Sequence, residues 1–414
     1  MVRLCLGLIP LAAILAWVLT RVVISISHRL NALDGQGVAG QVKDAPRRVP
    51  NTGGVAITLA VLLPILAGLW FYHGIDTSPD ADWRNDFSFI PADTAEHVAG
   101  IQAQTPLALL LVGCVLVLHV LGLIDDRRPL GPFLKLGVMA IPALAVPLLT
   151  TLSPSLDDTR LLTLLDHRVG GPWLSIVVTT LWFLVVTNAL NFMDNMDGLA
   201  AGVAAVAGAF FLVAALIAGQ WFVAAVLALV IGACLGFLVY NAPRRGGARI
   251  FMGDGGSLVL GFLLAFLTVR TTYLVPGSYS FSTPFGFESG TISDRAWYAV
   301  LMPLVVLAVP LYDFASVVLL RLSQGRSPFV GDLQHLSHRL VQRGLSKPAA
   351  VVTIWGLTAT TGISGVLLSR AAGWQALLIG VQVLVILGVI AAIEFARRPG
   401  DVRPPERNPS EPRA

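Results

Sequence analysis

Two adjacent acidic residues, Asp125 and Asp126, stand where a long apolar run ends, and Lys135 follows nine residues after the second of them. Two carboxylates this close repel each other when both are ionised, and a bound divalent cation relieves that repulsion. Two acids with a nearby lysine suit a metal–phosphate site, in which the acids bind the cation or accept a proton and the ammonium group pairs with phosphate. Helix capping is the alternative, but it accounts for one acid and not for two.

Four amide or acid side chains follow a later apolar run at intervals of three residues: Asn188, Asn191, Asp194 and Asp197. Each such step drifts by about 60° around an ideal α-helix, so the four converge better if the helix ends near Asn191 and the chain turns. Asp197 would then lie near the N-cap of the next helix. This arrangement predicts a pocket rim that hydrogen-bonds a nucleotide or sugar. The alternative is a polar turn between helices.

A third polar edge occurs in FMGDGGSLVLGF, where Asp254 precedes two glycines at the start of another apolar run. Backbone N–H groups at a helix start attract anions, and an adjacent carboxylate can hold the cation that neutralises a diphosphate. Asp254 and Asp126 are therefore the expected metal ligands, with helix capping again the alternative role of Asp254.

Two basic segments complete the candidate site. In KDAPRRVPNTGG, Lys43 and Arg48 are candidates to contact phosphate or nucleotide, although such flanks also serve as positive-inside anchors. His335 and His338 are three residues apart, so one helical turn places them on the same side, and Arg339 follows them. Imidazoles can donate to diphosphate oxygens, whereas a zinc site would lack obvious further ligands. Two histidines on a surface without function are the alternative.

The elements that position these residues are predicted to be membrane helices. The chain has 414 residues, of which 55% are hydrophobic and 13% are charged, and its mean hydropathy is +0.77. A soluble domain of this length could not cover itself with so few charges. About eleven apolar runs approach the length needed to cross a bilayer: 4–26, 54–72, 106–124, 133–150, 172–191, 198–218, 221–240, 257–272, 298–320, 349–368 and 374–395.

Lys and Arg in the loops predict the orientation of this all-α bundle. With the N-terminus outside, the inner loops and the C-terminal tail hold 20 of the 28 basic residues and the outer segments hold 6. We therefore expect an integral membrane domain over 1–395 and a Pro-rich, disordered cytoplasmic tail over 396–414. The net charge of +4 is explained by this inner face, where anionic lipid and phosphate would lie, so no nucleic-acid partner is expected. The predicted cytoplasmic active-site loops are 27–53, 125–135, 188–198, 241–257 and 321–348.

With these motifs in view, the chain resembles the polyprenyl-phosphate N-acetylhexosamine-1-phosphate transferases, a family that includes the phospho-MurNAc-pentapeptide translocase. The resemblance covers about 43–346 and rests on KDAPRRVPNTGG, GLIDDRRPLGPFLKL, NALNFMDNMDGLAAG, FMGDGGSLVLG, PLYD and GRSPFVGDLQHLSHRL. It implies transfer of a sugar 1-phosphate from a UDP-N-acetylhexosamine to undecaprenyl or decaprenyl phosphate, with GlcNAc 1-phosphate as the favoured group. UMP would be released, and Mg²⁺ or Mn²⁺ would be required. The product would start a lipid-linked envelope glycan, such as a wall polymer or lipopolysaccharide, at the cytoplasmic face of a bacterial inner membrane.

The resemblance also assigns roles to matched positions. Asp125 and Asp126 resemble the paired acids tied to metal and lipid-phosphate activation, Lys135 matches the lysine that follows them, and Asp254 resembles the metal ligand. Asn191, Asp194 and Asp197 match the polar set of the nucleotide-sugar pocket. His335 and His338 match the first and last histidines of a His-x-His-His pattern. The chain departs from the family at Ser337, which replaces the third-position histidine, and at Met139, where a glutamine often stands.

Alternatives remain open at this stage. Direct attack by the lipid phosphate and a two-step route through an aspartyl phosphate are both chemically sound. A catalytically silent paralogue that binds lipid or nucleotide is one rival function. A lipid-phosphate transporter is another, although transport pathways place ionisable residues at mid-depth and the acids here gather at one face. The sequence also allows a homodimer, but no motif specifies one.

Overall fold

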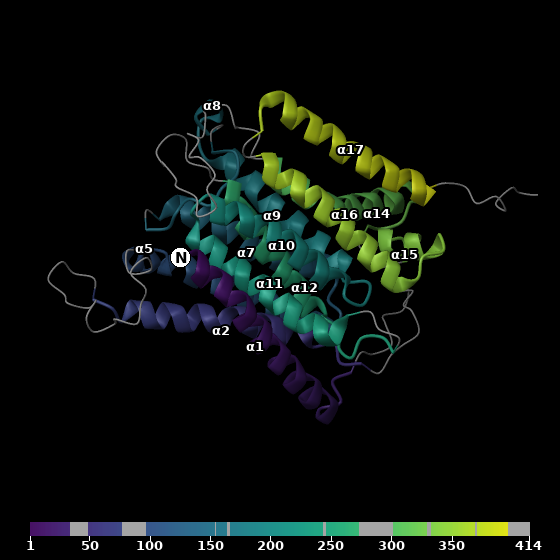
Figure 1. The fold of residues 1–414 in the computed structure, drawn as a ribbon, viewed down its shortest axis with the longest axis horizontal. Helices are drawn as coiled ribbons and strands as arrows, with labels where there is room; N and C mark the ends of the chain where they lie inside the picture. Colours follow the sequence, from purple (N-terminus) through teal and green to yellow (C-terminus); the bar gives the residue numbers. More distant parts are fainter. Residues whose placement is uncertain are drawn as a thin grey trace, which may run out of the picture.

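The protein is an all-helical bundle in the computed structural model (Figure 1), which confirms the predicted fold class. The structure describes residues 1–33, 49–76, 97–153, 155–163, 166–242, 246–272, 301–328, 333–368 and 371–395. Within those ranges there is no β-strand, and one isolated bridge joins Leu33 to Pro50. The helices are α1 (Val2–Arg29), α2 (Gly53–His73), α5 (Val98–Ala103), α6 (Thr105–Arg127), α7 (Pro132–Leu152), α8 (Asp166–Val169), α9 (Trp173–Met193), α10 (Leu199–Ile217), α11 (Trp221–Asn241), α12 (Asp254–Thr272), α13 (Met302–Val306), α14 (Ala308–Ser323), α15 (Leu336–Gln342), α16 (Lys347–Leu367) and α17 (Gly373–Phe395).

Ten helices of the described chain are long and apolar enough to cross a membrane, which confirms a polytopic membrane protein: α1, α2, α6, α7, α9, α10, α11, α12, α16 and α17. The eleventh predicted span, 298–320, differs from a single helix because its described part is divided at Leu307 into α13 and α14. Pro310 provides the physical reason. Proline has no N–H to donate to the carbonyl of Val306, so the helical ladder is interrupted one turn before it.

Helix α12 is the centre of the bundle. In its membrane-crossing stretch 89% of the residues are buried, and it packs against α9, α6, α2, α10 and α11. In α1 and α17 the corresponding share is 17%, and these two helices lie at opposite edges of the bundle with α10, α11 and α12 between them (Figure 1). A helix that is surrounded on all sides is apolar all round. Because α12 is in this central position, its polar first turn also lies inside the bundle, where the ends of neighbouring helices contact it.

Two glycines allow that meeting. A Cβ atom on Gly122 of α6 would lie 2.3 Å from the backbone nitrogen of Gly255, and one on Gly54 of α2 would lie 2.3 Å from that of Gly256. Side chains at these positions would push the helices apart, whereas glycine lets the backbones touch. The end of α6 and the start of α2 are consequently packed directly against the first turn of α12.

Backbone hydrogen bonds align the segment before α2 with the segment before α12. The N–H of Phe251 donates to the carbonyl of Pro50 at 2.8 Å, Gly53 donates to Phe251 at 3.0 Å, and Gly54 donates to Met252 at 2.8 Å. This pairing places residue 51 beside residue 253. The predicted contacts Lys43 and Arg48, together with the tail 396–414, lie outside the described residues.

Candidate active site

The two adjacent acids at the end of α6 point to different partners. Successive residues on an α-helix are about 100° apart, so their side chains diverge. Asp125 Oδ1 accepts the N–H of Leu130 at 2.6 Å and its Oδ2 accepts Lys135 Nζ at 3.0 Å. Asp125 therefore joins the end of α6 to the start of α7. The repulsion expected between two neighbouring carboxylates is reduced because each has its own donors.

Asp126 points into the bundle and caps α12 from outside that helix. Its Oδ1 accepts the N–H of Asp254 at 3.1 Å and the Asn51 side-chain amide at 3.0 Å, and its Oδ2 accepts the N–H of Gly255 at 3.3 Å. The first N–H groups of a helix carry partial positive charge, which stabilises an anion placed there. Gly253, at φ +70°, makes the turn into α12, and a Cβ there would lie 2.5 Å from Asp126 Oδ2.

Asp254, the first residue of α12, receives donors from two other helices. Lys135 Nζ contacts its Oδ2, and the side-chain amide of Asn191 donates to its Oδ1 at 2.9 Å. Asn191 Nδ2 also lies 2.9 Å from Ser257 Oγ. The Lys135 ammonium group thus bridges Asp125 and Asp254, and Asn191 connects α9 to the same carboxylate. The structure brings together Asp125, Asp126, Lys135, Asn191 and Asp254 around the start of α12.

The turn after α9 has the form that the three-residue spacing predicts, because α9 ends at Met193 and α10 begins at Leu199. Burial, with the nearby charges of Asp254 and Asp126, raises the pKa of the Asp194 carboxyl well above its usual range, and the N–H of Gly253 opposes that shift. Asp197 Oδ2 accepts the N–H of Ala248 at 2.9 Å. Asp194 therefore lies in the electrostatic field of the cluster, while Asp197 holds the segment that leads to it.

Asn188 has a different placement. Its side-chain amide donates to the carbonyl of Leu184 at 2.7 Å, within α9. Asn241, which carried no predicted role, fixes the next loop, because its Oδ1 accepts the N–H of Gly198 and its Nδ2 donates to the carbonyl of Ile250, each at 2.9 Å. The loop before α10 and the loop after α11 are thereby joined next to the acidic cluster.

A second polar group surrounds His335 at the start of α15. His335 Nδ1 lies 2.9 Å from Asp313 Oδ2, and Asp313 Oδ1 accepts the N–H of Leu336 at 2.6 Å. The ring of Phe192 stands edge-on to the imidazole with centroids 5.5 Å apart. Ser337 Oγ lies 2.5 Å from the side-chain oxygen of Asn195. Since Phe192 and Asn195 belong to the end of α9 and its turn, α15 is attached to the same turn as the acidic cluster.

The remaining predicted residues of α15 have unlike surroundings. His338 lies in the first turn of α15. The guanidinium group of Arg339 is buried, pairs with Glu394 and donates to Ser316. Sequence reasoning missed several residues that the structure places in or beside the site, although each of them stands within one of the motifs quoted above. The missed residues are Asn51, Phe192, Asn195, Ser257 and Asp313.

The donor set fits a hard divalent cation. Asp126 and Asp254 offer carboxylate oxygens, each able to accept about four hydrogen bonds or metal contacts in total, and the donors described above leave capacity on both. Within the described ranges no group of three or more His, Cys, Asp or Glu residues is arranged to hold a metal ion. One or two carboxylates are what Mg²⁺ takes from a protein when substrate phosphates and water complete its shell. The site therefore suits a cation that arrives with a phosphate substrate.

Fold and site together define an integral membrane protein whose helix ends form one carboxylate- and lysine-lined cluster suited to phosphate groups. The profile of glycosyl transferase family 4 matches residues 108–272. The chain is 31% identical to decaprenyl-phosphate N-acetylglucosaminephosphotransferase of Mycobacterium tuberculosis over 77% of each chain. It is 27% identical to the probable undecaprenyl-phosphate N-acetylglucosaminyl 1-phosphate transferase of Bacillus subtilis, over 91% of this chain and 88% of that one. It is also 35% identical to phospho-N-acetylmuramoyl-pentapeptide-transferase of Acetivibrio thermocellus over 49% of this chain and 65% of that one.

The protein belongs to glycosyl transferase family 4. The matched range begins within α6 and ends with α12, so it contains both acids of α6, the lysine of α7, the turn after α9 and the start of α12. Phosphotransferases of this kind generally depend on a metal ion. That dependence agrees with the oxygen donors gathered at the first turn of α12.

Proposed function

We propose that this protein transfers N-acetylglucosamine 1-phosphate from UDP-N-acetylglucosamine to undecaprenyl or decaprenyl phosphate and releases UMP. One observation carries the proposal: Lys135 bridges Asp125 and Asp254 at the point where Asp126 caps α12. The acids gathered around one ammonium group suit a divalent cation, and the ammonium group suits the diphosphate that this cation accompanies. The names of the relatives above supply the sugar and the lipid class.

Asp126 and Asp254 are the residues that would hold Mg²⁺ or Mn²⁺, which supplies neutralisation of the diphosphate charge when it is bound. Lys135 is placed to pair with phosphate oxygens once its contact with Asp254 is exchanged for substrate. Asn191 and Asp194 form the side of the cluster that faces the nucleotide sugar, and Asp197 supports their turn. His335, oriented by Asp313, and His338 are proposed to donate to the diphosphate.

In the proposed reaction a lipid-phosphate oxygen attacks the phosphorus that bears the sugar, a new P–O bond forms, and the bond from that phosphorus to UMP breaks. We favour this direct displacement over an aspartyl phosphate. Both oxygens of Asp126 accept N–H hydrogen bonds, and phosphorylation of either oxygen would weaken or break the bonds that it accepts. Asp125 and Asp126 instead hold the cationic and N–H groups in place, and either can accept the second proton of the lipid phosphate.

The location of the site suits both substrates. A charged nucleotide sugar arrives from water, whereas the acceptor's hydrocarbon tail remains in the bilayer, so the reaction belongs at a membrane edge. We propose that this edge faces the cytoplasm of a bacterial cell. Described basic residues at the same end of the bundle support that orientation: Arg29, Arg127, Arg128, Arg249, Arg321, Arg326, Arg343 and Lys347.

The test uses purified full-length protein in detergent with decaprenyl or undecaprenyl phosphate, Mg²⁺ and a panel of UDP-N-acetylhexosamines. We expect UMP release that requires the lipid phosphate, is fastest with UDP-N-acetylglucosamine, stops on addition of EDTA and returns with Mg²⁺ or Mn²⁺. No release from any sugar, in folded protein that retains lipid binding, would contradict transfer and favour a binding paralogue. Preference for UDP-N-acetylgalactosamine would correct the sugar alone.

A further inference from the structure

Glu394 is a buried acid on an outlying helix. Helix α17 lies at the edge of the bundle (Figure 1), and most of its large apolar side chains are exposed. Its buried residues are Val383, Ile390 and Glu394, and the Glu394 carboxylate has no exposed surface. Ionisable side chains inside membrane helices are costly and usually mark a function. A buried carboxylate on this otherwise lipid-facing helix therefore needs an explanation.

Two other helices supply the partners of Glu394. Tyr312 of α14 donates its hydroxyl to Glu394 Oε2 at 2.8 Å, and Arg339 Nη2 of α15 lies 3.2 Å from the same oxygen. Arg343, the residue that directly follows α15, donates from Nε and Nη2 to the backbone carbonyl of Glu394 at 3.1 and 2.5 Å. The last turn of α17 therefore joins α14 and α15.

Arg339 connects this junction to the histidines. It directly follows His338, and its backbone N–H donates to the carbonyl of His335 at 2.9 Å. Its Nη2 also donates to Ser316 at 2.7 Å, and its side chain is 8% exposed. A guanidinium group buried in this way acts on α15 rather than on a substrate in water.

Helix α15 depends on outside contacts for its orientation. It has seven residues, and helices this short are not stable on their own. Asp313 and Asn195 fix its first turn through Leu336 and Ser337. Its other side is fixed through Arg339, whose Nε and Nη1, like Glu394 Oε1, have no hydrogen-bond partner in the part of the chain that the structure describes. Among the described residues, Glu394 is the acid that pairs with Arg339.

We infer that Glu394 is a positioning residue for sugar-phosphate transfer: through Arg339 it holds α15 so that His335 and His338 face the diphosphate of the nucleotide sugar. This inference rests on the proposed function for the role of the histidines. The contact between Glu394 and Arg339 does not depend on that function. Removing the carboxylate leaves a buried, uncompensated guanidinium group, which has to move towards water and take α15 with it.

The kinetic test compares Glu394→Gln, Tyr312→Phe and a control, Leu384→Ala, which truncates a side chain that is 69% exposed on the same helix. For Glu394→Gln we expect kcat/KM for the UDP-sugar to fall on the order of 10²-fold, because small displacements of positioning groups have effects of that size. The KM for the UDP-sugar rises and the KM for polyprenyl phosphate stays unchanged. Tyr312→Phe has a smaller effect, and Leu384→Ala has none.

A double-mutant cycle tests whether the effect passes through Arg339. Once Arg339→Gln has removed the guanidinium group, adding Glu394→Gln should cost less than about twofold further, since the two changes break the same contact. Additive losses would overturn a role that acts through Arg339.

Hydrogen exchange separates this inference from the proposed function, because it requires no turnover. In substrate-free protein we expect the amides of residues 336–342 to exchange at least tenfold faster in Glu394→Gln than in the wild type, while those of α10 and α11 do not change. Unchanged exchange in α15, or faster exchange throughout the bundle, would overturn the positioning role. Absence of UMP release from the wild type would instead contradict the proposed function and leave the exchange result to decide the anchor.

Discussion

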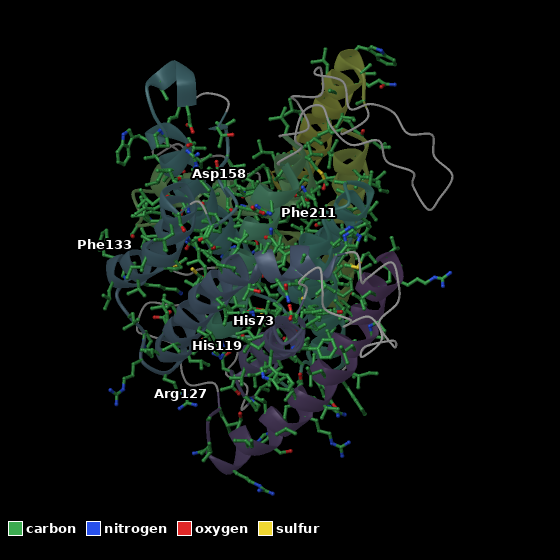
Figure 2. All side chains as sticks on the ribbon, turned by 90° about the vertical axis from the view of Figure 1, so that its left-hand side faces the viewer. His73, His119, Arg127, Phe133, Asp158 and Phe211 are labelled. Carbon is green, nitrogen blue, oxygen red and sulfur yellow. The ribbon has the colours of Figure 1, made fainter. Side chains whose placement is uncertain are left out.

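The acids at one polar end of the bundle and the acids around the first turn of α12, at the other end, have different partners. At the end opposite the site, guanidinium groups match the acids: Arg160 contacts Asp158 and Asp166, each at 2.7 Å, and Arg270 contacts Asp157 at 3.0 Å. At the site end, one ammonium group, that of Lys135, contacts both Asp125 and Asp254, and Asp126 is held by neutral N–H donors. Figure 2 shows Asp158 and Arg127, which represent the two ends, far apart in the molecule.

This difference separates a structural role from a functional one. Arg160 and Arg270 join loop 155–163 to α9 and α12, and their two guanidinium groups offset most of the charge of the three acids within the fold. The acids around α12 carry more negative charge than their described ion pairs neutralise, which disfavours the folded protein alone and favours a cation and phosphate ligand. Active sites commonly sacrifice stability in this way.

The largest effect is expected from Lys135→Gln, which removes the ammonium group shared by two acids. Loss of one preorganised electrostatic group typically lowers kcat on the order of 10²- to 10³-fold. The check is lipid-dependent UMP release from detergent-purified protein. Lys347→Gln, at an exposed position at the start of α16, is the matched control and should retain activity. Equal activity of both variants would contradict a role in transfer for the ammonium group that Asp125 and Asp254 share.

A smaller loss of activity, which tests one close contact between α6 and α12, is expected from Gly122→Ala. The added methyl group would lie 2.3 Å from Gly255 N, so α6 has to move away from α12 and the contacts of Asp126 lengthen. Overpacking of this kind destabilises the folded state by about 1–3 kcal/mol. We expect the rate of UMP release to fall even when it is measured at equal amounts of folded protein. Gly113→Ala on the same helix meets no atom within 4 Å and is the control. Comparable losses in both variants would mean that helix propensity, and not close approach, explains the result.

The smallest effect is the response of stability to pH, which should have opposite signs at the two ends. The pKa of Asp194 is raised in the folded protein. Its contribution to the free energy of unfolding is therefore present at low pH and is lost as pH rises through that raised pKa. Burial alone would raise the pKa of Asp157, but hydrogen bonds from Gln104 and Arg270 outweigh burial and hold that pKa below its usual range. The contribution of Asp157 is therefore lost as pH falls below the usual carboxyl range.

Melting temperatures in EDTA, measured from roughly pH 3 to pH 8, test these signs, because the range spans ordinary and raised carboxyl pKa values. Asp194→Asn should flatten the decline on the alkaline side, and Asp157→Asn should flatten the decline on the acid side. A flattening on the same side by both variants would contradict the opposite treatment of charge at the two ends.

The membrane-spanning helices were predictable because hydropathy over about 20 residues is a strong local signal. The division of 298–320 was not identified, because it depends on the hydrogen bond that Pro310 cannot make and not on polarity. Within the site, the turn after α9 followed from spacing alone. Asn51 and Asp313 acquire their roles from partners 75 and 22 residues away, Asp126 and His335, and periodicity carries no signal for such contacts. Glu394 stands within an apolar run, and its partners Tyr312 and Arg339 come from α14 and α15, so the run itself gave no signal for its role.

The most direct test measures UMP release by Asp126→Asn, Asp254→Asn and Asp157→Asn in one assay, with Mg²⁺, polyprenyl phosphate and UDP-N-acetylglucosamine, at equal amounts of folded protein. If the cluster at the start of α12 is the active site, the rate of UMP release falls on the order of 10²- to 10³-fold in the first two variants, and the third variant, at the opposite end, retains the wild-type rate. Retained release in both cluster variants, or equal loss in all three, would contradict the account.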